Sequence, residues 1–329
     1  MCSTTTAADP SPPGPSLLER LGDRRLVVVT GKGGTGKSTV AAALGMAAAK
    51  RGKRTLLIET GGAHGLASLL GRRSARYRVL PVGEGLHLLS MNAHDALEDY
   101  VVRQLKLRSL YRLVFRNRFM GPFIDTVPGL PDIIQLGKVW DLAQEGSASQ
   151  LHWDLLILDA PATGHGLTML GSPASMMDVT RSGPFHANAK RIHRLLTDPA
   201  QTAIVLTTLP EPLPVNEALQ LYQGLGPARE QVAGCVINQV HQPPFEPLDA
   251  WTAAAPALTR CEEPGWLEAV ALTDHWVTTT RQQRASSLRL GQALGLPTLA
   301  LPYRFQRQLE QQDLEALADS FAHQPLETP

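Results

Sequence analysis

A glycine-rich stretch between residues 31 and 39 carries the residue types with the most specific chemistry in this sequence. It reads Gly-Lys-Gly-Gly-Thr-Gly-Lys-Ser-Thr and fits G-x-x-x-x-G-K-[ST], a pattern typical of a loop that binds nucleotide phosphates. Its glycines let the backbone curl so that consecutive N–H groups point at phosphate oxygens, and the helix that follows adds partial positive charge. We expect Lys37 to meet the β- and γ-phosphates and the Ser38 hydroxyl to bind Mg²⁺. The residues predicted to bind the nucleotide here are Gly31, Gly33, Gly34, Thr35, Gly36, Lys37, Ser38 and Thr39.

An acidic residue at the end of an apolar segment is a second candidate for the same chemistry. Leu155–Asp159 is apolar until its last residue. A carboxylate at the end of such a strand holds Mg²⁺ in phosphate-loop proteins. We therefore predict that Ser38 and Asp159 form a magnesium site, Asp159 through water, and that Lys37 and Asp159 take part in catalysis.

Short apolar segments alternate with helical ones along most of the chain, and these elements must position the candidate groups. The predicted strands are Leu26–Thr30, Thr55–Glu59, Leu86–Met91, Leu155–Asp159, Ala203–Thr208, Gly234–Asn238 and Thr298–Leu301. Several are apolar throughout, as expected for parallel strands that are covered on both faces. The predicted fold class is therefore α/β, with a doubly wound, mainly parallel sheet.

Two long regions contain no convincing strand. They span about residues 95–150 and 167–199, and they predict a small helical subdomain over one edge of the sheet. We expect a single domain over residues 25–323, preceded by a flexible tail at residues 1–24 that is rich in Thr, Pro, Ser and Ala. Residues 324–329 are predicted to be a C-terminal tail.

Composition excludes several classes of protein. The chain has 329 residues and a formal net charge of +1, so no overall field attracts it to nucleic acid, and no nucleic-acid partner is expected. Its three cysteines, Cys2, Cys235 and Cys261, form no C-x-x-C pair, which argues against a disulfide framework or a structural zinc site. No apolar run approaches the ~18 residues of a membrane helix. No secretory signal is recognisable either, and a cytoplasmic protein is expected.

Lys32 is a second lysine, directly after the first glycine of the loop. This arrangement resembles the deviant Walker A motif of a dimerising class of ATPases. The class includes division-site and partition ATPases, nitrogenase iron protein, and the arsenite-pump and tail-anchored-protein-targeting ATPases. The resemblance implies a nucleotide-sandwich homodimer. In such a dimer Lys32 would reach the partner's nucleotide and act in catalysis as an arginine finger does in trans.

The segment that begins at Asp159 resembles the second switch of the arsenite-pump and tail-anchor-targeting family. It reads Asp-Ala-Pro-Ala-Thr-Gly-His and ends at His165, whereas the family pattern is Asp-Thr-Ala-Pro-Thr-Gly-His. The resemblance implies a switch role for His165, with Gly164 allowing the loop to move when the γ-phosphate is lost.

The segment that ends at His64 resembles the first switch of the same family. Thr60, Ala63 and His64 match the family pattern, but Gly61 stands where the family has the aspartate that orients the attacking water. Hydrolysis is therefore expected to be slow, unless Glu59 or another acid takes over this role.

Two late segments resemble the parts of this family that contact the base. Val236-Ile-Asn-Gln239 resembles the adenine-contacting strand end, which makes Asn238 the candidate for reading the base. The Asn-Lys-x-Asp pattern of guanine-specific loops is missing from this strand end, so ATP is favoured over GTP. Ala300-Leu-Pro-Tyr303 resembles the loop that closes over adenine. The chain has one unit, without a cysteine cluster, and resembles the shorter bacterial members of the family.

Basic and apolar residues are interspersed between residues 103 and 118. Arg112 and Arg116 share one face of the predicted helix. Two interpretations remain open, a surface helix packed on its own domain or a helix that binds a membrane or a client protein. In the second case Phe115, Met176 and Met177 would line the client groove, because methionine adapts to varied apolar partners. They could equally belong to the core.

The leading hypothesis is an ATP- and Mg²⁺-dependent homodimeric switch that couples its nucleotide state to an unidentified client protein or membrane partner. A second hypothesis is a non-hydrolysing nucleotide-binding subunit that forms a heterodimer with a catalytically complete paralogue. A partition-type ATPase is a weaker alternative, because the final helix, about residues 305–322, mixes acidic and basic residues and does not resemble a basic membrane-targeting tail. A fourth alternative, a metabolic kinase, has no support, because the sequence shows no motif for binding an acceptor substrate.

Overall fold

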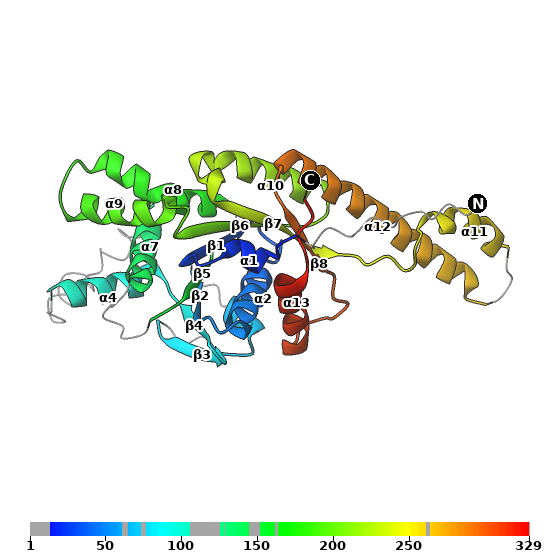
Figure 1. The fold of residues 1–329 in the computed structure, drawn as a ribbon, viewed down its shortest axis with the longest axis horizontal. Coiled ribbons are helices and arrows are strands. Elements are labelled where there is room, and N and C mark those ends of the chain that lie inside the picture. The colour runs from blue at the N-terminus through cyan, green and yellow to red at the C-terminus, as the bar shows by residue number, and fades with distance from the viewer. Residues whose placement is uncertain are drawn as a thin grey trace, which may run out of the picture.

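The structure is a computed structural model. It describes residues 14–60, 65–73, 77–105, 126–127, 129–144, 152–161, 164–260 and 264–328, and the side chains of residues 100–105, 164–165 and 184 fall outside this description. Its centre is an eight-stranded sheet with the order β3-β4-β2-β5-β1-β6-β7-β8 (Figure 1). The strands are β1 (Leu26–Gly31), β2 (Thr55–Glu59), β3 (Val79–Gly83), β4 (Leu86–Ser90), β5 (Leu155–Asp159), β6 (Thr202–Thr208), β7 (Val232–Val240) and β8 (Thr298–Pro302).

Neighbouring strands are parallel, except that β3 runs antiparallel to β4. The predicted α/β class and the mainly parallel sheet are thus confirmed. β3 was missed because it is an edge strand with only partly buried or exposed side chains, and it contains Pro81 and Gly83. Proline lacks an N–H for the ladder, so a segment of this kind gives a weak strand signal.

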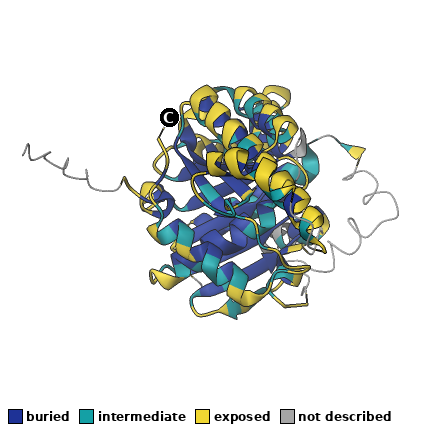
Figure 2. Ribbon diagram, turned by 90° about the vertical axis from the view of Figure 1, so that its right-hand side faces the viewer, coloured by how far each residue is buried: buried dark blue, intermediate teal, exposed yellow. Residues whose placement is uncertain are grey.

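Helices cover both faces of the sheet, because alternate side chains of each strand point to opposite sides. Val27 and Val29 belong to one core, and Leu26 and Val28 to the other. The first core is covered by α1 (Leu17–Leu21), α2 (Lys37–Lys50), α3 (Gly65–Leu69) and α13 (Gln311–His323). The second is covered by α7 (Leu130–Ala143), α8 (Gly164–Val179), α9 (Pro184–Thr197), α10 (Pro212–Gly224) and α12 (Trp266–Leu294). Figure 2 shows the buried sheet between these exposed helical surfaces.

The described part of the predicted helical subdomain consists of α4 (Ala93–Leu105), α7, α8 and α9. These helices pack against one another at one end of the molecule (Figure 1). Leu136, Met169 and Ile192 share one core with Leu156 of β5, so the helices continue the core of the sheet. The predicted basic helix lies almost entirely outside the described residues. Only the backbone of residues 103–105 is described, as the end of α4.

The two chain ends differ from the predicted tails where the structure describes them. Ser16 caps α1 in a capping box with Glu19, and Leu17 and Leu21 are buried in the first core. The predicted flexible tail is therefore wrong for residues 16–21. Near the other end, Leu326 is buried, and Glu327 exchanges backbone hydrogen bonds of 2.9 Å with Thr298 of β8. The final helix, α13, begins at Gln311 and not near residue 305.

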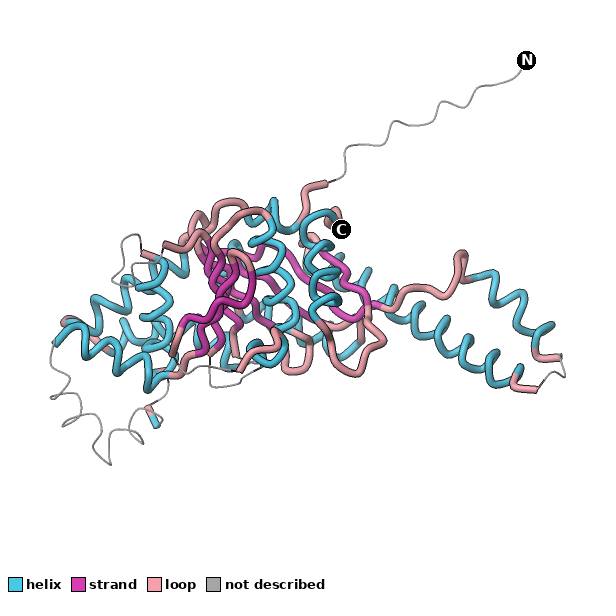
Figure 3. The backbone as a smooth tube through the Cα atoms, turned by 90° about the horizontal axis from the view of Figure 1, so that it is seen from below, coloured by secondary structure: helices cyan, strands magenta, loops and turns pink. Residues whose placement is uncertain are grey.

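A helical hairpin of α11 (Asp249–Leu258) and α12 projects from the body and is called the arm below (Figures 1 and 3). α12 has 29 residues, a length of about 44 Å at 1.5 Å per residue. Its C-terminal half packs on α10 and the sheet core, and its N-terminal half packs on α11 around Trp251, Val270 and Val277. No helix in the described part of the chain is both long and apolar enough to cross a membrane.

Candidate nucleotide-binding site

The phosphate loop connects β1 to α2 at the carboxyl ends of the parallel strands, where ligands bind in open α/β sheets. Gly34 and Gly36 have φ values of +83° and +84°, which residues with a side chain rarely adopt. At Gly36 a Cβ atom would lie only 2.1 Å from Nδ2 of Asn238, and at Gly31 only 2.2 Å from the carbonyl oxygen of Thr207. These two glycines are therefore required by close packing, and Gly34 by its backbone conformation.

The carbonyl oxygen of Lys32 organises the interior of the loop. It accepts hydrogen bonds from the Thr35 hydroxyl at 2.9 Å and from the Lys37 ammonium at 3.1 Å. Lys37 is buried although it carries a charge. Burial lowers the pKa of its ammonium group, and the nearby carboxylate of Asp159 opposes this shift.

Ser38 and Asp159 meet at the end of β5. The Ser38 hydroxyl donates a 2.6 Å hydrogen bond to Oδ2 of Asp159. The other oxygen, Oδ1, is buried and has no hydrogen-bond partner among the described residues. Burial raises the pKa of Asp159 to about 6, and Glu59 acts in the same direction, whereas the Ser38 hydrogen bond and the charge of Lys37 oppose the rise. A hydroxyl beside an incompletely satisfied carboxylate is the donor set that suits a hard cation such as Mg²⁺.

Two further buried hydroxyls without a described partner belong to Thr30 of β1 and Thr207 of β6, the strands that follow β5 in the sheet. Thr30 points to the face of the sheet covered by α8, where its hydroxyl lies next to Gly166, whereas Asp159 and Thr207 belong to the face covered by α2. The structure brings Lys37, Ser38 and Asp159 together, and these groups fit a phosphate–Mg²⁺ ligand.

Glu59, the acid considered as a substitute at the first switch, is held in a different role. Its Oε1 accepts a 2.8 Å hydrogen bond from the backbone N–H of Leu66, and its Oε2 accepts one of 2.8 Å from the Ser90 hydroxyl. The carboxylate is buried and fixes the start of α3 against β4. These two bonds fix the position of the carboxylate, although each oxygen keeps a further acceptor site. Gly61, Ala63 and His64 lie outside the described residues.

The second switch is described only in part. His165 lies in the first turn of α8, but its side chain is outside the described residues. Met176 lines an apolar cavity of about 160 Å³ between α4, α7, α8 and α9. Met177 is partly buried, and Phe115 lies outside the described residues.

Asn238 lies where β7 approaches the phosphate loop. Its Nδ2 donates a 3.1 Å hydrogen bond to the carbonyl oxygen of Thr35, and the side chain is buried. Next to it, a pocket of about 540 Å³ opens along the ends of β6, β7 and β8. It is lined by Leu209, Pro210, Glu211, Pro212, Gln239, His241, Thr279, Gln282, Gln283, Tyr303 and Phe305. The pocket lies at the same edge of the sheet as the phosphate loop, and its size and aromatic wall suit a nucleobase.

Several residues of this pocket were not found from the sequence. Thr279, Gln282 and Gln283 come from α12, which carries no recognisable motif, and only contact with the pocket identifies them. Gln283 is fixed by accepting a 2.7 Å hydrogen bond from the backbone N–H of His241. Glu217 of α10 was also missed, and its carboxylate lies 3.0 Å from the ammonium of Lys32.

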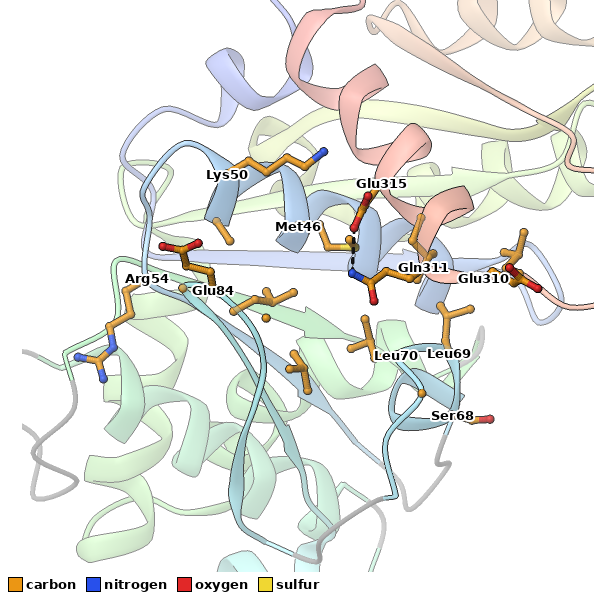
Figure 4. A pocket seen from close by; sticks show the side chains of 18 of the residues that line it. Met46, Lys50, Arg54, Ser68, Leu69, Leu70, Glu84, Glu310, Gln311 and Glu315 are labelled. Atoms are coloured by element: carbon orange, nitrogen blue, oxygen red, sulfur yellow. Dashed lines mark hydrogen bonds between the residues drawn. The ribbon is translucent and has the colours of Figure 1, made fainter.

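A larger hollow, of about 1090 Å³, lies away from the phosphate loop (Figure 4). It runs between the end of α2, α3, the β3–β4 turn and the start of α13, with Met46, Leu69 and Leu70 among its apolar walls. None of the phosphate-loop residues lines it. The phosphate loop therefore lies outside this hollow.

Sequence comparisons agree with this geometry. The family described as anion-transporting ATPase matches residues 24–183. ATPase BagA of Mycobacterium tuberculosis is 33% identical over 266 residues, which cover 77% of this chain and 75% of that protein. An ATPase ASNA1 homolog of Entamoeba dispar is 25% identical over 65% of this chain and 76% of its own length. A protein named as an arsenical pump-driving ATPase of Aquifex aeolicus is 28% identical over 46% of this chain and 39% of its own length. The chain belongs to the ArsA-type family of anion-transporting ATPases.

Proposed function

We propose that this chain is an ATP- and Mg²⁺-dependent ATPase that dimerises on nucleotide and passes its nucleotide state to a partner. The observation that carries the proposal is the hydrogen bond from Ser38 to Asp159, with the buried Oδ1 of Asp159 left without a described partner beside Lys37. Family membership supports the ATPase activity.

Each loop residue has a separate role in this proposal. Gly33, Gly34, Thr35, Gly36 and Thr39 belong to the loop and helix start that enclose the phosphates, together with Gly31. Lys37 would exchange its bond to the Lys32 carbonyl for phosphate oxygens, and Ser38 and Asp159 would hold Mg²⁺, Asp159 through water. The bound metal would neutralise charge that develops on the phosphates.

The base would occupy the pocket of about 540 Å³ beside Asn238. Tyr303, Phe305 and His241 form a cluster of rings with centroids 4.8–5.8 Å apart, which offers a stacking surface for a purine. Asn238 is bonded to the loop, and the next residue, Gln239, lines the pocket, so we propose that Asn238 reads adenine.

Partner coupling would use the helical layer of α4, α7, α8 and α9. The apolar cavity among these helices is lined by Trp140, Met176 and Ile192, and Phe185 at its rim is 64% exposed. Exposed apolar residues around a cavity are typical of a binding surface for a protein. α8 also begins at the second switch, with His165 in its first turn, so it connects the nucleotide site to this surface.

A second candidate function is a nucleotide-binding subunit that hydrolyses ATP little by itself and pairs with a paralogue. The two hydrogen bonds that engage Glu59 favour this candidate. Gly61 provides no carboxylate, and the carboxylate of Glu59 is anchored to Leu66 and Ser90.

Steady-state ATP hydrolysis and light scattering distinguish the two candidates. We expect the wild-type protein to hydrolyse ATP and to dimerise with Mg²⁺ and an ATP analogue. Lys37→Ala should abolish binding and turnover, whereas Lys32→Ala should bind nucleotide but neither dimerise nor turn over. Lys50→Ala is the matched control, because Lys50 is an exposed lysine at the far end of α2 that pairs with Asp319. Tight ATP binding with no turnover would favour the second candidate, and a chain that stays monomeric with nucleotide would refute the homodimer.

A further inference from the structure

The side chain of Lys32 is engaged within its own chain. Its ammonium lies 3.0 Å from Oε1 of Glu217, with the two side chains 44% and 23% exposed. The backbone of Lys32 is held by the bonds that its carbonyl accepts from Thr35 and Lys37. The loop therefore fixes the backbone of Lys32, and the ion pair with Glu217 fixes the position of its ammonium group.

Glu217 is carried by a rigid helix. α10 buries Val215, Ala218 and Leu221 against the second core. The residue before Glu217, Asn216, accepts a hydrogen bond from Arg289 of α12. Pro212, the first residue of α10, lines the base pocket. The helix thus holds Glu217 at a fixed place beside Lys32 of the phosphate loop.

We propose that Glu217 is a latch that keeps Lys32 on its own chain until a nucleotide-loaded second copy arrives. The proposal rests on the proposed function, in which Lys32 reaches the nucleotide of the partner. One ammonium cannot contact its own Glu217 and the phosphates of a second nucleotide in the same geometry, so closing the dimer requires the pair to break. While the ion pair is formed, Glu217 neutralises the charge of Lys32 and holds its ammonium group away from the dimer interface.

The ion pair between Lys32 and Glu217 is weak enough to break when the dimer forms. An ion pair as exposed as this one biases an equilibrium by no more than about 5-fold. A triphosphate with its several negative charges can displace a single carboxylate of this kind. Because a symmetric dimer must open two latches, removing both should favour dimerisation by up to ~25-fold, which is about 5-fold per chain.

The first test is the dimer dissociation constant of Glu217→Gln, measured by sedimentation with Mg²⁺ and a non-hydrolysable ATP analogue. Glutamine keeps the shape of the side chain and removes its charge, and we expect a dissociation constant ~3- to 25-fold lower than that of the wild type. Glu230→Gln is the control, since it makes the same charge change at an exposed position in η1 (Gly226–Gln231), and it should leave the constant unchanged. The Lys32→Ala variant is not expected to dimerise, and adding Glu217→Gln to it should not restore dimerisation. An unchanged or higher constant in the single variant would show that Glu217 does not restrain Lys32.

The second test examines the latch without any dimer. The rate at which an amine-acylating reagent labels Lys32 is measured by mass spectrometry in dilute, nucleotide-free protein, with Lys50 as the internal reference. Loss of the ion pair should expose the amine, so Glu217→Gln should raise the Lys32 rate several-fold and leave the Lys50 rate unchanged. An unchanged Lys32 rate overturns the latch. If the wild type never dimerises but the Lys32 rate rises in Glu217→Gln, the proposed function fails and the restraint itself stands.

Discussion

The carboxyl group of Asp159 lies in a buried environment that disfavours its charged form. Burial raises its pKa from 3.8 to about 6, so the folded chain binds a proton more tightly than the unfolded chain does. Between these two values the folded state holds more protons, and its stability therefore falls as the pH rises. The charged carboxylate is costly to bury unless a cation compensates it.

The free-energy cost of burying the charged carboxylate can be measured by replacing Asp159. Asp159→Asn keeps an oxygen that can accept the Ser38 hydrogen bond and cannot ionise. In metal-free buffer we expect the free energy of unfolding of the wild type, relative to that of the variant, to be about 2 kcal/mol lower at pH 7 than at pH 4.5. Urea unfolding at the two pH values provides the measurement. A difference that does not change with pH would show that Asp159 titrates normally in the folded chain.

Gly34 and Gly36 lie in the same loop but show two different reasons why a position requires glycine. Their φ values are nearly equal, but only at Gly36 does the space for a Cβ collide with a side chain, that of Asn238. Both alanine variants carry the strain of a left-handed backbone, and Gly36→Ala adds an overlap. We expect Gly36→Ala to lose at least ~1 kcal/mol more stability than Gly34→Ala.

An additional substitution tests the cause of that difference. In an Asn238→Ala background the collision partner is gone, so the gap between the two glycine variants should shrink. The gap is measured by urea unfolding of Gly34→Ala and Gly36→Ala, each in the wild-type and in the Asn238→Ala background. The two backgrounds themselves serve as references. A gap that persists without the Asn238 side chain would place the cause in the backbone alone.

At the scale of elements, the arm has its own small core and should unfold separately from the sheet. Trp251 is buried between α11 and α12 and donates a 3.1 Å hydrogen bond from Nε1 to Asp274. Replacing a buried tryptophan with alanine removes ~3–5 kcal/mol, more than so small a cluster can readily lose. Trp251→Ala should therefore speed amide hydrogen exchange across residues 249–258 and leave β1 and β5 protected.

Trp276 provides the matched control for the arm. It lies on α12 as well, but its ring is on the surface, and its Nε1 donates to the carbonyl oxygen of Gln242. Trp276→Ala should leave exchange in α11 near the wild-type rate. Equal effects of the two variants, measured by mass spectrometry, would contradict a core centred on Trp251.

The elements that the sequence predicted best are those whose burial is uniform. β1, β2, β5 and β6 are buried along their entire length, so an unbroken apolar run was sufficient to find them. The arm escaped notice because α12 changes partner along its length. Val270 and Val277 face α11, whereas Gln283 and Leu290 are buried at the body. Since no single face stays apolar, the periodicity of α12 predicts neither its length nor its projection.

The residues of the candidate site likewise divide into those that a local sequence signal marks and those that no signal marks. The phosphate-loop pattern and the strand-end aspartate are local signals, and the structure brings Lys37, Ser38 and Asp159 together. The contact between Lys32 and Glu217 joins residues 185 positions apart in the chain, and no motif marks the glutamate. The sequence left Glu59 open as a catalytic acid, and only its contacts with Leu66 and Ser90 show that it also anchors α3 to β4.

At the scale of the whole molecule, the helical layer and the arm lie at opposite ends of the sheet (Figures 1 and 3). The nucleotide site is on the central strands between them, and each end connects to it through one element. α8 starts beside the second switch, and α12 contributes Thr279 and Gln283 to the base pocket. In the proposed function, a nucleotide that closes the site would act on both ends at once.

Thermal unfolding at several protein concentrations tests whether this closure includes a second copy. A ligand that binds only the folded state raises its stability by about 2.7 kcal/mol at 100 times its Kd. For a dimer the midpoint also rises with protein concentration, by about 1–2 °C per tenfold increase for a chain of this size. We expect the wild type to show both effects with Mg²⁺ and an ATP analogue, and no dependence on protein concentration without nucleotide. Lys37→Ala should show neither effect, and Lys32→Ala should show the rise with nucleotide alone. A wild-type midpoint that rises with nucleotide but ignores protein concentration would assign nucleotide binding to the monomer and remove the trans role of Lys32.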